Sequence, residues 1–308
     1  MSSWTIERQT DAETVFHSPA SVPETVELLG RLQGRVRLLA GGTDVVVELN
    51  EGQGPPPEHL VYLGRLDELK TVSQEDHNLK LGALLSHAQL AADSLVCESA
   101  PLIAAAAGRV GGPAIRTMGT IGGNVATASP AGDVSTALLA LEAQAEVMGP
   151  AGRRTIPLTE LFLGPGQTCL AADELICHFS IALKTGLPVG HCFEKFGQRR
   201  AMSIATVSCA AALWLEPDKR RIAAAALSLG SVAPTPLRAV KAEAKLVGAV
   251  PDEELFAAAA QTAAGECSPI DDIRASAGYR RELAAVLVRR CLSQASRLAR
   301  GAEPIITR

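Results

Sequence analysis

The amino-acid sequence predicts an α+β protein with two domains, and three patterns carry that prediction. Up to about residue 185, short strand-like runs alternate with short helix-like runs. Two apolar runs, 206–214 and 221–229, then flank a polar turn at 216–219 and indicate an antiparallel hairpin. Helical periodicity fills most of the remaining chain, so the second domain begins with strands and ends with helices. A chain of 308 residues is long enough for two such domains.

The first lobe of the N-terminal domain is expected at about 1–63. Ser21 and Glu24 have the spacing of a capping box, with Pro23 in the first turn, which predicts a helix as far as Gly34. The lobe continues with a strand, the start of a second helix and a short buried strand, expected at 35–40, 45–47 and 59–63.

The second lobe is expected at about 64–185. Ser86 is suited to cap a short helix, and a glycine-rich loop is expected at 161–166. Its other elements are expected as strands at 79–83, 145–147 and 175–183, and as helices at 101–107 and 134–141. Gly186 and Pro188 interrupt the pattern, which predicts domains at 1–185 and 186–308. The helices of the second domain are expected at 236–247, 252–264 and 277–300.

Composition excludes several classes of function. A net charge of −4 and a pI of about 5.9, without a long basic run, argue against a nucleic-acid partner. No apolar run reaches the ~18 residues that a membrane helix requires, and the N-terminus lacks the apolar core of a signal peptide. The expectation is a cytoplasmic protein without a membrane span.

The cysteines and histidines do not indicate a metal site. None of the seven cysteines forms a CxxC pair and the count is odd, which favours buried reduced thiols over disulfides or iron–sulfur ligands. The six histidines are dispersed, and His87, His178 and His191 are expected to cap, pair or pack.

One stretch suits a phosphorylated ligand. It runs from Gly119 to Asn124 (GTIGGN) and continues through Ser129 to Asp133. Closely spaced glycines allow positive φ and a close approach of ligand to backbone, and consecutive N–H groups can hold an anion. Asp133 would repel phosphate but can accept hydrogen bonds from ribose hydroxyls, so a nucleotide cofactor is indicated. The alternative is a glycine-rich turn that only packs tightly.

A second stretch favours the cofactor. The strand at 35–40 leads into Gly41, Gly42, Thr43 and Asp44, and a helix start follows at 45–47. Strand, glycine turn and helix start is an arrangement that presents N–H groups to a pyrophosphate. Neither stretch is a GxGxxG or Walker sequence. We name residues 40–44 the first clamp and residues 119–124 the second clamp, and together they indicate a long ligand with two phosphates.

The two clamps resemble those of the FAD-binding subunits of the molybdenum hydroxylases, which include xanthine dehydrogenases, carbon monoxide dehydrogenases and hydroxylases of N-heterocycles. The sequences that carry the resemblance are AGGTD at 40–44, TIGGN at 120–124, and ASP at 128–130 with Asp133. Further similar segments lie at 16–24, 194–204, 229–237 and 273–280, so the resemblance covers nearly the whole chain.

The resemblance implies a fold and a set of cofactor contacts. The fold is a two-lobed FAD-binding domain of the vanillyl-alcohol-oxidase (PCMH) type, followed by a smaller α+β domain of the carbon monoxide dehydrogenase flavoprotein type. Val45 and Ile176 would lie against the flavin, Lys195 near its ring system, and Ile204 on a covering loop. Lys195 would stabilise negative charge on reduced flavin. The expected non-covalent FAD contacts are Ala40, Gly41, Gly42, Thr43, Asp44, Val45, Thr120, Ile121, Gly122, Gly123, Asn124, Thr127, Ser129, Asp133, Ile176 and Lys195.

The resemblance also implies a function in electron transfer. Molybdopterin would sit on a large partner subunit and 2Fe-2S clusters on a small one. Electrons would pass from the clusters through this chain's FAD to an acceptor such as NAD or a quinone-type carrier. The sequence around Gly164, Pro165 and Gly166 looks most similar to purine-type subunits, so the substrate is expected to be a purine or aromatic N-heterocycle. The alternatives are a self-sufficient oxidase of the vanillyl-alcohol type and a non-catalytic nucleotide-binding assembly module.

Overall fold

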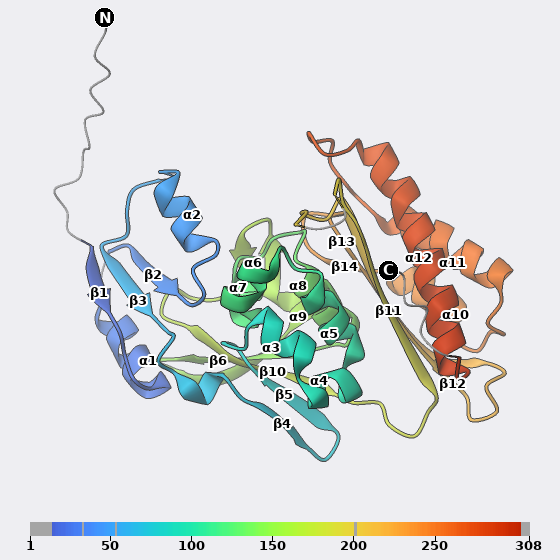
Figure 1. Cartoon of the computed structure of the whole chain (residues 1–308), viewed down its shortest axis with the longest axis horizontal. Helices are drawn as coiled ribbons and strands as arrows, with labels where there is room; N and C mark the ends of the chain where they lie inside the picture. The colour runs from blue at the N-terminus through green and yellow to red at the C-terminus, as the bar shows by residue number, and fades with distance from the viewer. Residues whose placement is uncertain (1–13, 33, 53, 200–201, 303–308) are drawn as a thin grey trace, which may run out of the picture.

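The computed structural model describes residues 14–32, 34–52, 54–199 and 202–302, and Figure 1 shows their arrangement. The first lobe contains a parallel three-stranded sheet in the order β1-β3-β2. Helix α1 begins after the Ser21 cap, as expected, although the Glu24 carboxylate accepts from Ala20 N–H at 2.7 Å and not from Ser21. The elements are β1 Val15–His17, α1 Val22–Arg31, β2 Val36–Leu39, α2 Val45–Asn50 and β3 His59–Tyr62.

The second lobe is built on an antiparallel five-stranded sheet in the order β4-β5-β10-β6-β7. Its strands are β4 Val72–Glu75, β5 Asn78–Gly82, β6 Gln144–Gly149, β7 Gly152–Pro157 and β10 Leu175–Ala182. Six helices lie between β5 and β6: α3 His87–Ala92, α4 Ser94–Ser99, α5 Pro101–Gly108, α6 Pro113–Met118, α7 Ile121–Ala126 and α8 Asp133–Ala140. The 3₁₀ helix Asp67–Leu69 precedes β4, and α9 Leu158–Leu161 follows β7.

The last part of the chain is an antiparallel sheet, β11-β12-β13-β14, followed by three helices. Strand β12 is buried on both sides because its alternate side chains enter two different cores. Cys209, Ala211 and Leu213 pack under the terminal helices, whereas Ala210 and Ala212 join the core of the second lobe. The elements are β11 Val189–Phe196, β12 Val207–Leu215, β13 Ile222–Gly230, β14 Leu237–Arg238, α10 Val240–Leu246, α11 Glu253–Glu266 and α12 Ala277–Ala299.

The α+β prediction is confirmed, and the differences from it are local. The helix expected at 236–247 begins only at Val240, because Leu237 and Arg238 pair with β13 as a short strand. The loop expected at 161–166 is largely the tight hairpin of β8 Phe162–Gly164 and β9 Gln167–Thr168. No helix or strand of the described chain crosses residue 185, but α8 and β12 share one core. The division into 1–185 and 186–308 therefore stays a prediction.

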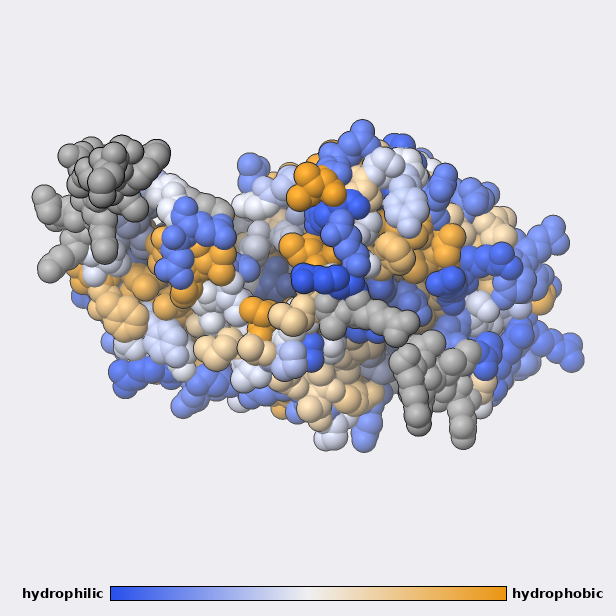
Figure 2. Space-filling view, turned by 45° about the horizontal axis from the view of Figure 1, so that its top comes forward, coloured by the Kyte–Doolittle hydropathy of each residue, from blue (hydrophilic) through white to orange (hydrophobic). Residues whose placement is uncertain are grey.

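The surface seen in Figure 2 is mostly charged or polar, with separate apolar patches. Within the described residues, no helix has the combination of length and hydropathy needed to cross a membrane.

Candidate functional site

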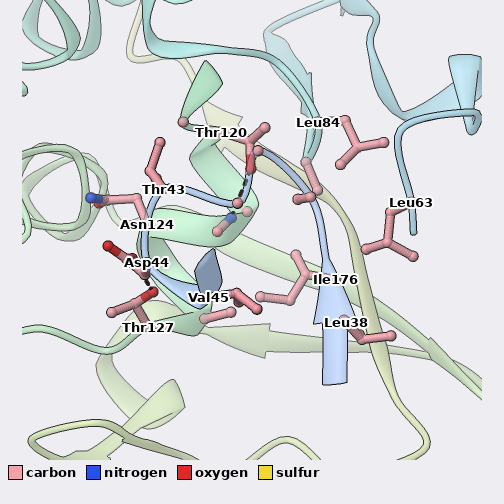
Figure 3. A pocket seen from close by; sticks show the side chains of 18 of the residues that line it. Leu38, Thr43, Asp44, Val45, Leu63, Leu84, Thr120, Asn124, Thr127 and Ile176 are labelled. Atoms are coloured by element: carbon pink, nitrogen blue, oxygen red, sulfur yellow. Dashed lines mark hydrogen bonds between the residues drawn. The ribbon is translucent and has the colours of Figure 1, made fainter. Parts of the chain in front are cut away.

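A cavity of about 450 Å³ lies where the first lobe meets the second, between the two clamps. This volume is within the range of small-molecule binding sites. Figure 3 shows that one side of the cavity is apolar, with Leu38, Leu63, Leu84 and Ile176, and that Thr43, Asp44, Asn124 and Thr127 lie on the other. The cavity therefore offers an apolar surface for a ring and a polar surface for a charged chain.

The first clamp presents free backbone donors. Within the described part of the chain, the N–H groups of Gly42, Thr43 and Asp44 form no hydrogen bond. Gly42 has φ +74°, and the following helix α2 begins at Val45. Three successive free N–H groups around a left-handed residue can form a concave anion site. This part of the expected phosphate site is therefore available to a ligand.

The second clamp has a different local structure from the one expected. It is not a loop with positive φ, because residues from Ile121 onward form helix α7 with Thr120 as its N-cap. The N–H groups of Ile121 and Gly122 donate to Leu85 O and Ala83 O, at 2.9 and 2.8 Å. The N–H of Gly123 donates to Thr120 Oγ1 at 3.0 Å. The expectation of a free N–H concavity here is wrong, because neighbouring oxygen atoms of the protein occupy these donors.

The glycines at the clamps instead allow close packing. A Cβ on Gly122 would stand 2.7 Å from Ala83 O, and a Cβ on Gly41 would stand 1.8 Å from Met118 O. Such distances are far below van der Waals contact, so only glycine fits either position without a backbone shift. Gly41 thereby brings the first clamp directly against the residues that enter the second.

Two hydrogen-bonded contacts fix the polar wall. Thr127 Oγ1 donates to Asp44 Oδ2 at 2.7 Å and joins the end of α7 to the first clamp (Figure 3). Asn124 Oδ1 accepts from the N–H and hydroxyl of Ser135, at 3.2 and 3.1 Å. Asn124 therefore ties α7 to α8 through Ser135.

Asp133 and Lys195 form a buried ion pair. Lys195 Nζ lies 2.5 Å from Asp133 Oδ2 and also donates to Arg109 O at 3.1 Å. Burial raises the pKa of Asp133 to about 6, while the Lys195 ammonium acts in the opposite direction. Asp133 Oδ1 is buried and, among the described residues, has no hydrogen-bond partner. This carboxylate oxygen is therefore an unused acceptor, although Asp133 itself does not line the cavity.

The structure brings most of the expected contact residues to the cavity wall. Those that line it are Ala40, Gly41, Gly42, Thr43, Asp44, Val45, Thr120, Gly122, Gly123, Asn124, Thr127 and Ile176. Ile121 belongs to the hydrophobic core, and Ser129 Oγ accepts from Ala131 N–H at 3.3 Å. Neither residue lines the cavity, and nor do Asp133 and Lys195.

The loop that was expected to cover the flavin carries exposed side chains. Ile204 is 65% exposed, and the exposed Arg199 donates to Met202 O at 2.8 Å. Arg200 lies outside the described residues.

The seven cysteines are free thiols, and four of them, Cys177, Cys209, Cys267 and Cys291, are buried. The described residues contain no group of three or more potential metal ligands.

Sequence reasoning missed several lining residues. Leu38, Leu63 and Leu84 complete the apolar side, and each comes from or follows a strand whose other side chains enter the core. Glu174 also lines the cavity, and its carboxylate pairs with Arg154 at 2.6 and 2.7 Å. His87 lines the cavity too, although the sequence indicated that it would cap, pair or pack. Only the alternation of side chains between the two faces of the strands could have indicated that these leucines line the cavity.

Comparison with known proteins identifies relatives along almost the whole chain. Residues 9–183 match the family described as the FAD binding domain in molybdopterin dehydrogenase, and residues 192–295 match the CO dehydrogenase flavoprotein C-terminal domain. The chain is 34% identical over 283 residues to the carbon monoxide dehydrogenase medium chain of Hydrogenophaga pseudoflava, covering 91% of this chain and 96% of that one. It is 31% identical to the xanthine dehydrogenase FAD-binding subunit of Escherichia coli O157:H7, covering 93% and 97%.

Solved structures agree with the sequence matches. The carbon monoxide dehydrogenase of Hydrogenophaga pseudoflava superposes with a TM-score of 0.88 at 33% identity, covering 92% of this chain and 98% of that one. Quinoline 2-oxidoreductase from Pseudomonas putida 86 gives a TM-score of 0.87 at 28% identity, covering 93% and 98%. The predicted two-lobed N-terminal part and α+β C-terminal part are thus confirmed.

Proposed function

This chain belongs to the family of FAD-binding medium subunits of the molybdenum hydroxylases, and we propose that it binds FAD non-covalently and transfers electrons within such an enzyme. The observation that carries the proposal is that Gly42, Thr43 and Asp44 line a cavity with an apolar side and that their N–H groups have no partner among the described residues. These donors suit a diphosphate, and the apolar side suits a ring system.

The residues present fit the parts of FAD. The first clamp would hold the diphosphate, and Asp133 Oδ1, which lies outside the cavity lining, would accept from a sugar hydroxyl only where the cofactor extends beyond that lining. Val45 and Ile176 would pack against a ring, with Leu38, Leu63 and Leu84 beside them. The second clamp would contribute bare peptide and the position of α7, since its N-terminal donors are already bonded. With FAD bound, the chain would carry electrons between clusters on a partner and an external acceptor.

Lys195 would act on the cofactor from behind the cavity wall. Its ammonium is held by Asp133 and by Arg109 O, and Arg109 directly precedes the lining residue Val110. A fixed positive charge at that position favours negative charge on a ring in the cavity. Asp133 keeps the ammonium in place and partly offsets its charge.

The proposed partners are a molybdopterin-binding large subunit and a 2Fe-2S small subunit. Ile115 lines the cavity and is 39% exposed, and Met118 on the same helix is 57% exposed. Met202 is 62% exposed and lies against Gly112, the N-cap of that helix. An apolar rim at the cavity suits a covering protein surface.

We further propose a purine or aromatic N-heterocycle as substrate of the complex, NAD or a quinone-type carrier as acceptor, and a cytoplasmic location.

The test uses the purified full-length chain and the complete complex. The isolated chain is expected to be yellow, to carry about one FAD, and to accept electrons from dithionite. It is expected to oxidise no purine or N-heterocycle by itself, because it would lack the molybdenum centre. Turnover of such a substrate by the single chain, at the rate of the complex, would favour the self-sufficient oxidase. A colourless chain that cannot be reconstituted with FAD would favour the assembly module.

A further inference from the structure

His87 is the one histidine that lines the cavity within the described chain. It is the first residue of α3, after the Ser86 cap, and only 3% of its surface is exposed. Its backbone N–H donates to Gly119 O at 3.0 Å, which fixes the residue beside the entrance to the second clamp. Gly119 in turn touches the first clamp, because a Cβ on Gly41 would stand 3.1 Å from Gly119 Cα. The imidazole therefore lies at the junction of the two clamps.

The two nitrogens of the ring have different surroundings. Nδ1 is fully buried and has no hydrogen-bond partner among the described residues. Nε2 lies on the ring edge that faces Gly119, 3.4 Å from where a Cβ on that glycine would stand. A proton on Nδ1 would be a buried donor without an acceptor, which is costly. The neutral ring is therefore expected to carry its proton on Nε2, on the side where the clamps meet.

We propose that His87 is a cofactor-binding residue that donates from Nε2 to the diphosphate of FAD, and that it takes up a proton when the diphosphate binds. The proposal rests on the proposed FAD site and extends it to a residue outside both clamps. A diphosphate held by the first clamp would supply the acceptor that the ring lacks in the free chain. The bond is a hydrogen bond from an imidazole to an anion, which is stronger than one between neutral groups.

Proton uptake follows from the electrostatics of the ring. Burial lowers the pKa of His87 to about 4, so the free chain holds a neutral imidazole at pH 7. Asp44 acts to raise this pKa and Arg116 on α6 to lower it. Cys97 and Glu98 on the neighbouring α4 are exposed, and α5 carries no titratable side chain. A diphosphate would add negative charge beside the ring, raise its pKa, and make FAD binding tighter as pH falls from 7 toward about 4.

The experiment is isothermal titration calorimetry of the apo full-length chain with FAD at pH 5.5, in two buffers of different ionisation enthalpy. The wild-type chain is expected to take up a measurable fraction of a proton per FAD bound. His87→Asn is expected to lose that uptake and to bind FAD about ten- to a hundred-fold more weakly. Riboflavin, which lacks phosphate, is expected to produce no uptake with the wild-type chain, so this comparison needs no variant.

His178 provides the matched control. Its Nδ1 is also buried without a partner in the described chain and burial also lowers its pKa, but it lies on β10 and does not line the cavity. His178→Asn is expected to keep both the proton uptake and the affinity for FAD. Equal affinity and equal uptake in wild type and His87→Asn would overturn the role of His87 while leaving the FAD site intact. Failure of the wild-type chain to bind FAD would instead overturn the proposed function itself.

Discussion

Lys195 on β11 and Asp133 at the start of α8 lie 2.5 Å apart, and their side chains are only 6% and 5% exposed. The pair connects segments on either side of the predicted boundary at residue 185. Removing two charges from water is costly, and a partner offsets that cost only while both charges are present. Burial raises the pKa of the Asp133 carboxyl, and the Lys195 ammonium acts in the opposite direction.

Lys195→Met is expected to destabilise the chain in a pH-dependent way. At pH 8 the Asp133 carboxylate would be buried without its counter-charge, at a cost of roughly 3–5 kcal/mol. The loss is expected to shrink as pH falls from 8 toward about 6, because the unpaired Asp133 takes up a proton in the variant, and to be small below about 6, where wild-type Asp133 is itself protonated. The sign follows because a folded-state pKa raised above its unfolded value makes ionisation at high pH unfavourable for folding. Urea denaturation at pH 5, 6, 7 and 8 measures the trend.

Lys184→Met is the control for that series. Lys184 pairs with Glu142 at 3.6 Å, but their side chains are 42% and 58% exposed. An exposed ion pair contributes little, so a change under about 1 kcal/mol with weak pH dependence is expected. A similar loss in both variants, independent of pH, would contradict the account of the buried pair.

Asp133→Ala is expected to weaken FAD binding by ~1.5–3 kcal/mol, the usual range for a hydrogen bond to a charged group. The reason is the Oδ1 atom, which has no partner among the described residues and would accept from a sugar hydroxyl if the bound cofactor extends past the residues that line the cavity. Fluorescence titration of apo-protein with FAD gives the affinity. If the affinity did not change, Asp133 would serve only to hold Lys195.

Gly41→Ala is expected to distort the contact between the clamps. The new Cβ would stand 1.8 Å from Met118 O, so the backbone must move, at a cost of about 1–3 kcal/mol or more, and FAD affinity should fall. Gly278→Ala is the control, because a Cβ there meets no described atom within 4 Å and lies in α12. That variant should change stability by no more than about 1 kcal/mol and keep FAD. Thermal unfolding and bound-flavin absorbance distinguish the two.

Gly123→Val is expected to prevent stoichiometric FAD binding. Gly123 lines the cavity, and a Cβ would already stand 3.0 Å from Thr120 Oγ1, which caps α7. The reason is therefore occupied space and a disturbed cap. It is not backbone strain, since Gly123 is helical. Purified variant that retained one FAD per chain would show that the cofactor lies elsewhere.

Acid precipitation of the purified chain is expected to release all flavin into the supernatant. The cavity offers hydrogen-bond donors and apolar side chains for non-covalent binding. Absorbance of the supernatant and of the redissolved pellet measures the partition. Flavin that stayed with the precipitated protein would require a covalent attachment.

The features that the sequence predicted are local ones. The helix after Ser21, the glycine turn at Gly41 and Gly42, and the hairpin around 216–219 all depend on residues close together in the chain. Side-chain periodicity and turn chemistry act over a few residues, so they can be recognised without the fold. The same holds for the two clamps as motifs, whose residues are contiguous.

Tertiary structure decided which groups at those motifs are free to bind. Carbonyls of Ala83 and Leu85 occupy donors of the second clamp, whereas the first clamp keeps its donors free within the described chain. Asp133 meets Lys195 across 62 positions of sequence, and His87 lines the cavity beside Gly119, whose carbonyl accepts its N–H. The sequence alone determined that the chain has two glycine clamps and an α+β fold. Only the fold decided which of their N–H groups are free and which charged side chains lie near them, because hydrogen bonding and burial depend on neighbours that are distant in the chain.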